Sequence, residues 1–220
     1  MKKIIPHYWT MLMALSAALV LSGCQTQKPE AASTAPAEKA NTMAQTAQTP
    51  QDNSATAGTP TAPAVVVPPN TVFRVDAGSD APFTDSEGHV WLADQGFSGG
   101  DIITRDPDTK ITGTKDTGMF MTEHYGMDSF SCKIPNGKYT AKLYFCETYD
   151  GIAGPGQRVF SLNVQGHEFK DFDVWVKAGG PGKPYVLTVP VEVTDGVFKI
   201  DFTTQTENPE INAIEIIPNS

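Results

Sequence analysis

Residues 130–145 read Phe-Ser-Cys-Lys-Ile-Pro-Asn-Gly-Lys-Tyr-Thr-Ala-Lys-Leu-Tyr-Phe, and this segment indicates the fold class most clearly. Apolar residues alternate with polar ones on both sides of Pro135-Asn136-Gly137, and a period of two is typical of strands that bury one face. The Pro-Asn-Gly segment favours a tight turn. The segment therefore predicts two strands joined as a β-hairpin.

The same period recurs on both sides of this segment. Predicted strands lie at 72–75, 130–134, 139–145, 158–164, 168–174, 185–191, 197–202 and 211–216. Gln165-Gly166 and Asp195-Gly196 mark turns between them, and Asp195-Gly196 predicts a second hairpin of this kind. No window of twelve residues shows a helical period. Strands without intervening helices predict an all-β fold, most simply a jelly-roll β-sandwich of antiparallel strands.

Composition divides the 220 residues into three parts. Residues 71–220 hold 18 of the 20 aromatic residues and a net charge of −10, and they predict one folded domain. Residues 25–70 contain 33 Ala, Thr, Pro, Gln and Ser among 46 residues, which predicts a disordered linker. Residues 1–24 carry a charge of +2 and an apolar run. An acidic domain without a basic stripe excludes nucleic acid as an expected partner.

The first 24 residues predict export from the cell. Lys2 and Lys3 precede an apolar run over 11–21, which is too short to span a bilayer comfortably and is typical of a signal peptide. Leu21-Ser-Gly-Cys24 resembles a bacterial lipobox, in which Cys24 receives the lipid; a plain signal peptide is the alternative. By resemblance to the sorting rule of some Gram-negative bacteria, Gln25 after the cysteine implies the outer membrane, on its periplasmic or its surface face. The expected location is therefore the bacterial cell envelope.

Two further cysteines, Cys132 and Cys146, lie in the predicted domain. On the predicted hairpin they lie about 20 Å apart along the strand. A disulfide requires Cα atoms within about 7 Å, so we predict two free, buried thiols.

Seven segments resemble segments of one protein family in the same order. They are Val75-Asp-Ala-Gly-Ser79, Gly88-His-Val-Trp-Leu-Ala-Asp-Gln95, Thr122-Glu-His-Tyr-Gly126, Pro135-Asn-Gly-Lys-Tyr139, Leu143-Tyr-Phe-Cys-Glu-Thr-Tyr149, Arg158-Val-Phe-Ser-Leu-Asn-Val164 and Asn208-Pro-Glu-Ile-Asn-Ala-Ile214. Together they resemble malectin and the malectin-like carbohydrate-binding modules attached to bacterial glycoside hydrolases. The resemblance covers about residues 72–218.

This resemblance implies a β-sandwich that binds an oligo- or polysaccharide, with glucose-containing sugars among the candidates, in a cleft formed by loops at one end. The family's binding tyrosines fall on Tyr125 and Tyr149. Asp150 stands where the family has Phe, and Glu207, beside Asn208, stands where it has Asp. A further binding tyrosine has no counterpart, and Phe97 is the candidate to occupy its space. The implied ligand-binding residues are Tyr125, Tyr149, Asp150, Glu207, Asn208 and Phe97.

The chemistry of these residue types agrees with the resemblance. A tyrosine offers an apolar ring to the C–H face of a sugar and a hydroxyl to its polar groups. Tyr125 and Tyr149 stand at strand ends, where loops on a rigid scaffold carry function. Alternation places Trp91 in the core, whereas Trp175 fits either the core or the rim of the cleft.

The sequence also fits other functions. Glu147 and Glu207 form a candidate glycosidase carboxylate pair, although a non-enzymatic role is expected. A module of the cell surface that binds protein instead of sugar fits the same fold. No cofactor or catalytic metal is predicted; a structural Ca²⁺ among the Asp-rich loops (Asp76, Asp80, Asp85, Asp101, Asp106 and Asp108) is the one ion considered.

Overall fold

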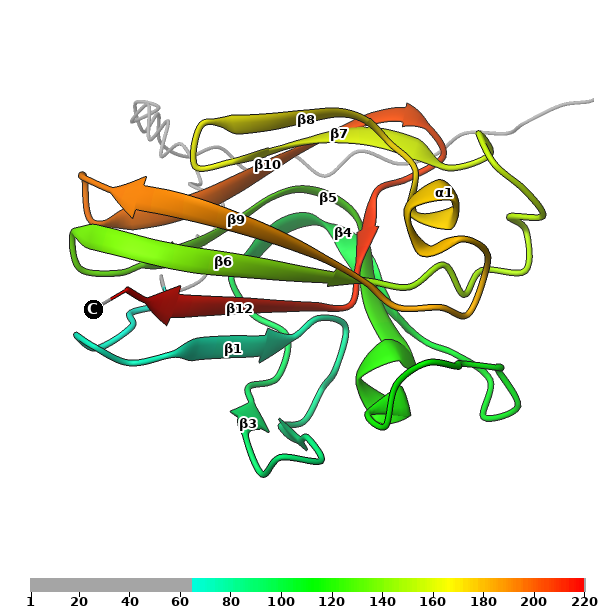
Figure 1. Cartoon of the computed structure of the whole chain (residues 1–220), viewed down its shortest axis with the longest axis horizontal. Helices are drawn as coiled ribbons and strands as arrows, with labels where there is room; N and C mark the ends of the chain where they lie inside the picture. The colour runs from blue at the N-terminus through cyan, green and yellow to red at the C-terminus, as the bar shows by residue number, and fades with distance from the viewer. Residues whose placement is uncertain (1–64, 220) are drawn as a thin grey trace, which may run out of the picture. The chain divides into compact units, whose positions relative to one another are not determined.

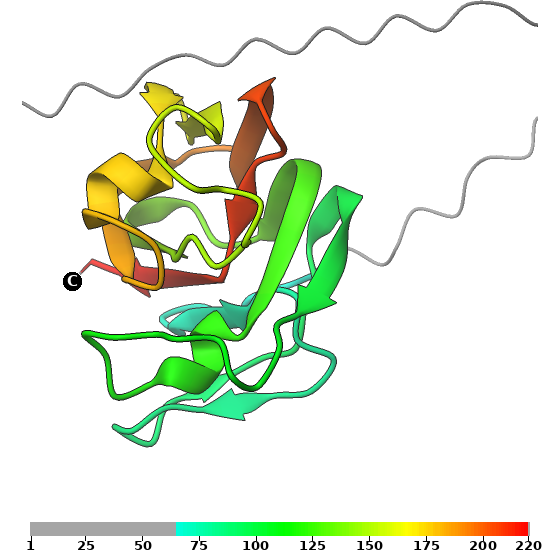
Figure 2. The ribbon, with the colours of Figure 1, turned by 90° about the vertical axis from the view of Figure 1, so that its right-hand side faces the viewer.

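Residues 65–219, the part of the chain that the computed structural model describes, form two antiparallel β-sheets packed face to face (Figures 1 and 2). The four-stranded sheet has the order β1 (Phe73–Asp76), β12 (Ala213–Pro218), β6 (Gly137–Phe145) and β9 (Tyr185–Val193). The six-stranded sheet contains β4 (Phe97–Thr104), β5 (Thr122–Lys133), β7 (Val159–Val164), β8 (His167–Phe172), β10 (Val197–Thr206) and β11 (Glu210–Ile211). The predicted all-β sandwich is confirmed.

Smaller elements complete the domain. A two-stranded sheet joins β2 (Phe83–Thr84) to β3 (Val90–Trp91), and a 3₁₀ helix, η1, spans Thr117–Phe120. The helix α1 (Val174–Ala178) begins where we predicted a strand to end. Asp173 caps it by accepting a hydrogen bond from the Val176 amide, and Gly179 ends it in the left-handed conformation. None of the helices within residues 65–219 is long and apolar enough to cross a membrane.

Alternating side chains of the two sheets fill the space between them. The largest fully buried ones include Phe130, Phe145, Phe160, Phe172 and Phe198. The Phe130 and Phe198 rings meet edge-to-face, and the rings of Phe145, Phe160 and Phe172 contact one another at tilted angles. Trp91 is buried in a smaller cluster, as predicted. Cys132 and Cys146 are free and buried, also as predicted.

The two predicted hairpins are wrong. Pro135-Asn136-Gly137 connects β5 of one sheet to β6 of the other, and β6 pairs with β9 and β12 instead of β5. Asp195-Gly196 likewise crosses from β9 to β10. The two crossing turns bond to each other: the Asn136 side chain donates to the Thr194 carbonyl and accepts from the Gly196 amide. Turn dipeptides indicate where the chain reverses, but partner choice is decided by the distant strands that bury each face.

The β7–β8 turn at Gln165-Gly166 is a hairpin within one sheet. At the other end of the described chain, Val67 is buried and its amide donates to the Lys133 carbonyl. The sequence assigned Val67 to the linker; the structure places it against the core beside β5.

Candidate functional site

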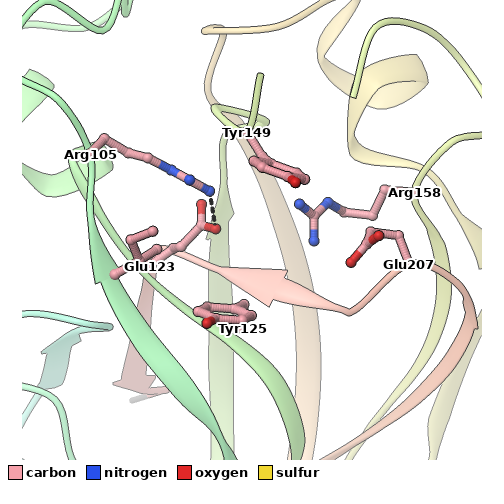
Figure 3. A pocket seen from close by; sticks show the side chains of 7 residues that line it. Arg105, Glu123, Tyr125, Tyr149, Arg158 and Glu207 are labelled. Atoms are coloured by element: carbon pink, nitrogen blue, oxygen red, sulfur yellow. Dashed lines mark hydrogen bonds and ion pairs between the residues drawn. The ribbon is translucent and has the colours of Figure 1, made fainter. Parts of the chain in front are cut away.

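The candidate site lies at the end of the sandwich opposite the two crossing turns. A pocket of about 200 Å³ opens there, lined by Ile103, Arg105, Glu123, Tyr125, Tyr149, Arg158 and Glu207. Figure 3 shows the rings of Tyr125 and Tyr149 on opposite sides of the pocket, with the Arg105–Glu123 pair on one flank and Arg158 and Glu207 on the other. Its residues come from segments as far apart as β4 and the turn that follows β10.

A β-bulge turns Tyr125 into this pocket. Where β4 pairs with β5, the partner of Ser98 is Ser129 but the partner of Gly99 is Met127, so Asp128 is an extra residue. The extra residue shifts the alternation of β5 by one position. Glu123 and Tyr125 consequently lie on the face that Phe130 and Cys132 occupy farther along the strand. Gly100 allows the close approach of β4, because a Cβ there would lie 2.3 Å from the Tyr125 carbonyl oxygen.

Tyr149 is held in a turn just beyond β6. Its amide donates to Glu147 Oε1 over 3.0 Å, and its carbonyl accepts from the Ile152 amide. The Arg105 guanidinium lies 5.6 Å from the centre of the ring, a cation–π contact. The residue is nevertheless 45% exposed. The ring is therefore positioned but still accessible to a ligand.

Glu207 stands in the turn between β10 and β11 with φ = 59°, a left-handed conformation that is uncommon for a glutamate. Its Oε1 atom accepts a hydrogen bond of 3.1 Å from the Asn208 amide. The Pro209 ring that follows restricts Asn208 to extended conformations. These constraints fix where the exposed carboxylate of Glu207 lies at the pocket rim.

Two ion pairs supply three of the residues that line the pocket, namely Arg105, Glu123 and Arg158. Arg105 pairs with Glu123, and both contact the Thr148 hydroxyl: Arg105 Nε donates to it over 3.0 Å, and it donates to Glu123 Oε2 over 3.2 Å. Arg158 Nε donates to Glu147 Oε2 over 2.7 Å, and the Arg158 guanidinium also donates to the Asn208 carbonyl. All of these side chains are largely buried, so the pairs hold charge in place where water cannot screen it.

A third carboxyl group lies beneath the pairs. Glu210 is completely buried, and neither of its oxygens has a hydrogen-bond partner within the described chain. Burial, together with the negative charges of Glu123 and Glu147, raises the pKa of Glu210 well above 4.5. Burial also raises the pKa of Glu123, against the opposing effect of Arg105. With Glu210 protonated, the two arginines balance the two remaining glutamates.

The structure gathers three of the six predicted ligand-binding residues into this pocket, namely Tyr125, Tyr149 and Glu207. Asp150 lines a neighbouring pocket on the other side of Tyr149. Asn208 contributes its carbonyl to Arg158 rather than a side chain to the lining. Phe97 packs inward: its ring stacks on His124, with centroids 4.2 Å apart, and meets Phe130 edge-on.

Sequence reasoning missed Arg105, Glu123 and Arg158. Glu123 and Arg158 stand inside the quoted family segments, but single charged residues gave no sign of burial until the bulge and the sheet packing were known. Within residues 65–219 no group of three or more His, Cys, Asp or Glu side chains is arranged to hold a metal ion.

The malectin domain family matches residues 71–214 of the chain. The chain belongs to this family. The segments that line the pocket, from β4 to the turn after β10, lie inside the matched region. Malectin domains are a carbohydrate-binding fold family, so the pocket stands on a scaffold that is used for binding.

Curated relatives match smaller parts of the chain. A probable receptor-like protein kinase of Arabidopsis thaliana is 28% identical over 121 residues, which cover 47% of this chain and 15% of the kinase. A probable leucine-rich repeat receptor-like serine/threonine-protein kinase of the same plant is 38% identical over 72 residues, covering 30% of this chain and 7% of the kinase. The chain thus spans a small part of these relatives.

Solved structures share the fold at low identity. A β-glucuronidase of Bacteroides uniformis has a TM-score of 0.61 and 20% identity, with 68% of this chain and 18% of the enzyme covered. The plant receptor-like kinase FER has a TM-score of 0.58 and 19% identity, with 72% and 53% covered. The ANX1 ectodomain from Arabidopsis thaliana has a TM-score of 0.59 and 16% identity, with 67% and 48% covered.

Proposed function

We propose that this domain binds a glycan without chemically changing it, with one sugar unit in the pocket between Tyr125 and Tyr149. The observation that supports this most is the placement of two tyrosine rings on opposite sides of a pocket with fixed polar groups on its flanks. Sugar rings require both kinds of surface, apolar faces for their C–H groups and fixed donors and acceptors for their hydroxyls.

The polar flanks are suited to hydroxyl groups. A guanidinium has five N–H donors, and the ion pairs of Arg105 and Arg158 leave some of them for a ligand. The Glu207 carboxylate and the two tyrosine hydroxyls supply acceptors. The volume of about 200 Å³ is below the ~300–1,000 Å³ typical of drug-sized ligands, which fits one small unit of a longer chain.

The same contacts argue against hydrolysis. A glycosidase needs one carboxyl group to give a proton and another that is free to attack or to activate water. Both oxygens of Glu147 are engaged, by Arg158 and by the Tyr149 amide, and both oxygens of Glu123 are engaged, by Arg105 and Thr148. The match to the Bacteroides glucuronidase covers only 18% of that enzyme.

We also propose that Cys24 carries a lipid and anchors the domain to the envelope of a bacterium, most simply its outer membrane. Cys24 and the expected linker up to residue 64 lie outside the described residues. Cys24→Ala should abolish incorporation of labelled palmitate in a bacterial host and release the protein from the membrane fraction. Labelling that survives this substitution would contradict the anchor.

The sugar-binding proposal is tested by a glycan array, followed by calorimetry on the best neutral binder. For a single site of this kind we expect a Kd between about 10 µM and 1 mM. Tyr125→Ala and Tyr149→Ala should each weaken binding at least about tenfold, a loss of about 1.4 kcal/mol. Val186→Ala, which trims an exposed apolar side chain on β9, is the matched control. Unchanged affinity in both tyrosine variants would refute the proposal.

A second candidate function is recognition of a peptide or protein. One structure with the same fold is a complex of the receptor FER with a plant peptide, at 19% identity to this chain. If the domain has this function, no glycan on the array should bind. Capture of a protein partner should then require Tyr149. The small volume of the pocket, about 200 Å³, favours a single sugar unit over a segment of a protein partner.

A further inference from the structure

We propose that His124 is a positioning residue for the pocket. In its doubly protonated form it fastens three segments to the back of β5, and loss of one proton loosens them and weakens ligand binding. We call this arrangement of His124 and its hydrogen-bond partners Asp94 and Gly99 the latch. The latch itself does not depend on a ligand, whereas its effect on affinity rests on the proposed function. It is carried by the surroundings of His124, which is buried beside Tyr125 in the chain but lies on the opposite face of β5.

Both ring nitrogens of His124 face oxygen atoms that accept hydrogen bonds. Nδ1 lies 2.8 Å from Asp94 Oδ2, and Nε2 lies 3.0 Å from the Gly99 carbonyl oxygen. A carbonyl oxygen can only accept, and Asp94 Oδ2 already accepts from the Gly78 amide over 2.7 Å. An imidazole donates from both nitrogens only when it carries both protons, so this geometry fits the imidazolium ion.

The latch joins segments that are distant in the sequence. Asp94 belongs to the segment between β3 and β4, and its amide donates to the Ser79 carbonyl over 2.8 Å. The Gly78 amide, which donates to the Asp94 carboxylate, belongs to the segment after β1. Gly99 belongs to β4. His124 therefore holds the segment after β1, the segment before β4 and β4 itself against β5.

Carboxylates surround His124 on its own face of β5. Asp94 contacts the ring, and the negative charge of Asp101 acts on it from β4. Asp76, at the end of β1, is buried and interacts with the charge of Asp94. Asp128, the extra residue of the bulge in β5, lies against β4. A positive charge on the ring is therefore balanced by its surroundings.

The other elements packed around the ring are apolar or balanced in charge. Phe97 stacks on the ring with centroids 4.2 Å apart, and Ile211 is the residue of β11 that pairs with His124. On the opposite face of β5, Glu123 is paired with Arg105. Burial lowers the pKa of His124, but its two hydrogen bonds and the nearby aspartates outweigh burial and raise that pKa above 6.5.

The latch reaches the pocket through both strands that it holds. On β5, the residues on either side of His124 line the pocket from the other face of the strand. On β4, Gly100 packs against the Tyr125 carbonyl, and Ile103 lines the pocket. When His124 loses one proton, one of its two contacts sets an acceptor against an acceptor and breaks. β4 is then held less firmly beside Tyr125, and the pocket is less well formed for a ligand.

The direction of the pH effect follows from the raised pKa. Because the pKa of His124 is higher in the folded than in the unfolded state, the contribution of the latch to stability is complete below about pH 6.5. That contribution is lost as the pH rises through the folded pKa, and binding should weaken over the same interval. Asp76, whose pKa burial raises to about 7, adds its own slope to wild type and variants alike.

The test follows the ring by NMR and the pocket by calorimetry. Long-range ¹H–¹⁵N spectra at a series of pH values report the protonation of each ring nitrogen. We expect both nitrogens of His124 to carry protons at pH 7, with a titration midpoint above 6.5. Asp94→Asn removes the charge and keeps the side-chain size, and it should lower this midpoint by at least about one pH unit. The Kd for the best neutral saccharide should rise about two- to tenfold through the midpoint of each protein.

Two further variants complete the test. His124→Gln should bind about two- to tenfold more weakly than wild type at low pH and should lack the change at the wild-type midpoint. His167→Gln, at the exposed start of β8, is the matched control and should keep the wild-type profile.

The outcomes separate the latch from the proposed function. A ring with one protonated nitrogen at pH 7 overturns the proposal, and so does an affinity midpoint that stays in place when Asp94→Asn moves the NMR midpoint. If no saccharide binds, the proposed function fails, and the latch is decided by NMR and urea unfolding. The difference in unfolding free energy between wild type and His124→Gln should then shrink as the pH rises through the midpoint, and a constant difference contradicts the latch.

Discussion

At one end of the sandwich, β5, β6, β9 and β10 are joined by two short crossing turns. The other end carries the aromatic and charged side chains of the pocket. The crossing turns are tied together through the exposed Asn136 side chain. The pocket end is tied together by buried ion pairs around Arg105 and Arg158.

The difference shows how one small domain separates stability from binding. Apolar packing and neutral hydrogen bonds at the crossing-turn end stabilise the fold without leaving polar groups to satisfy. The buried charges at the pocket end contribute little net stability, since desolvation offsets their attraction, but they fix donors where a ligand can meet them. Substitutions at the two ends should therefore have different consequences.

The largest effect is expected for Arg158→Met. This change leaves the carboxylate of Glu147, which is 1% exposed, buried without its cation. Losing one partner of a buried pair costs about 3–5 kcal/mol, and urea denaturation of the variant should show a loss of that size. A loss below about 1 kcal/mol would mean that the pair is not part of the structural frame of the pocket.

The next effect concerns the pH dependence of stability. Because the pKa of Glu210 is higher in the folded than in the unfolded state, its contribution to stability is complete below about pH 4.5 and is lost as the pH rises through the folded pKa. One such proton gives a slope of up to about 1.4 kcal/mol per pH unit. The free energy of unfolding is measured by urea denaturation at a series of pH values. Above pH 4.5, its slope against pH should be smaller in Glu210→Gln than in wild type by up to this amount.

Asp76, whose pKa burial raises to about 7, contributes its own slope to both proteins, so only the difference between the two curves is informative. Exposed Glu192 is the control, since Glu192→Gln should leave the curve unchanged. Parallel curves for wild type and Glu210→Gln would show that Glu210 is ionised in the fold.

A smaller effect is expected at the crossing-turn end. Asn136→Ala removes the two hydrogen bonds between the turns and should cost about 1–2 kcal/mol in thermal or urea unfolding. Saccharide affinity should stay within twofold of wild type, because the pocket lies at the other end. Weaker binding at unchanged stability would contradict the separation of the two ends.

The mildest change tests the placement of Tyr149. A Cβ at residue 151 would lie 2.4 Å from Tyr149 Cε1, so Gly151→Ala must turn the exposed ring away from its position. Stability should change by less than about 1 kcal/mol, while saccharide affinity should fall about two- to tenfold, the value of one aromatic contact. Gly154→Ala, at a site with open space around it, is the matched control. Equal affinity in the two variants would mean that the ring position does not matter.

Local sequence patterns predicted many of the strands, because the period of side chains along a strand is a local property, but they missed β4 and residues 122–129 of β5. The pairing of those strands depends on residues that are far away in the sequence, so local patterns did not predict it. Pro135-Asn136-Gly137 fits a hairpin as well as a crossing turn, and only the pairing of β6 with β9 and β12 separates the two. The bulge at Asp128 was likewise invisible, since an extra residue is defined by the strand opposite.

The residues of the candidate site show the same difference between what local sequence reveals and what distant contacts decide. Tyr125, Tyr149 and Glu207 were identified by resemblance, and all three line one pocket. Phe97 does not line this pocket: it is partly buried against the core, and its ring stacks on His124. Arg105 and Arg158 could not be predicted, because a buried arginine is recognised by its partners, which lie 18 and 11 residues away along the chain.

The central claim, that the pocket between Tyr125 and Tyr149 binds a sugar, is tested most directly by NMR chemical-shift mapping. Isotope-labelled protein is titrated with the best neutral saccharide from the array. We predict that the largest shift changes fall on Tyr125, Tyr149, Glu207 and the arginine side chains of the pocket, and that they saturate with a single Kd. Shift changes that gather on another face of the sandwich, or that are equally large in Tyr125→Ala/Tyr149→Ala, would contradict it.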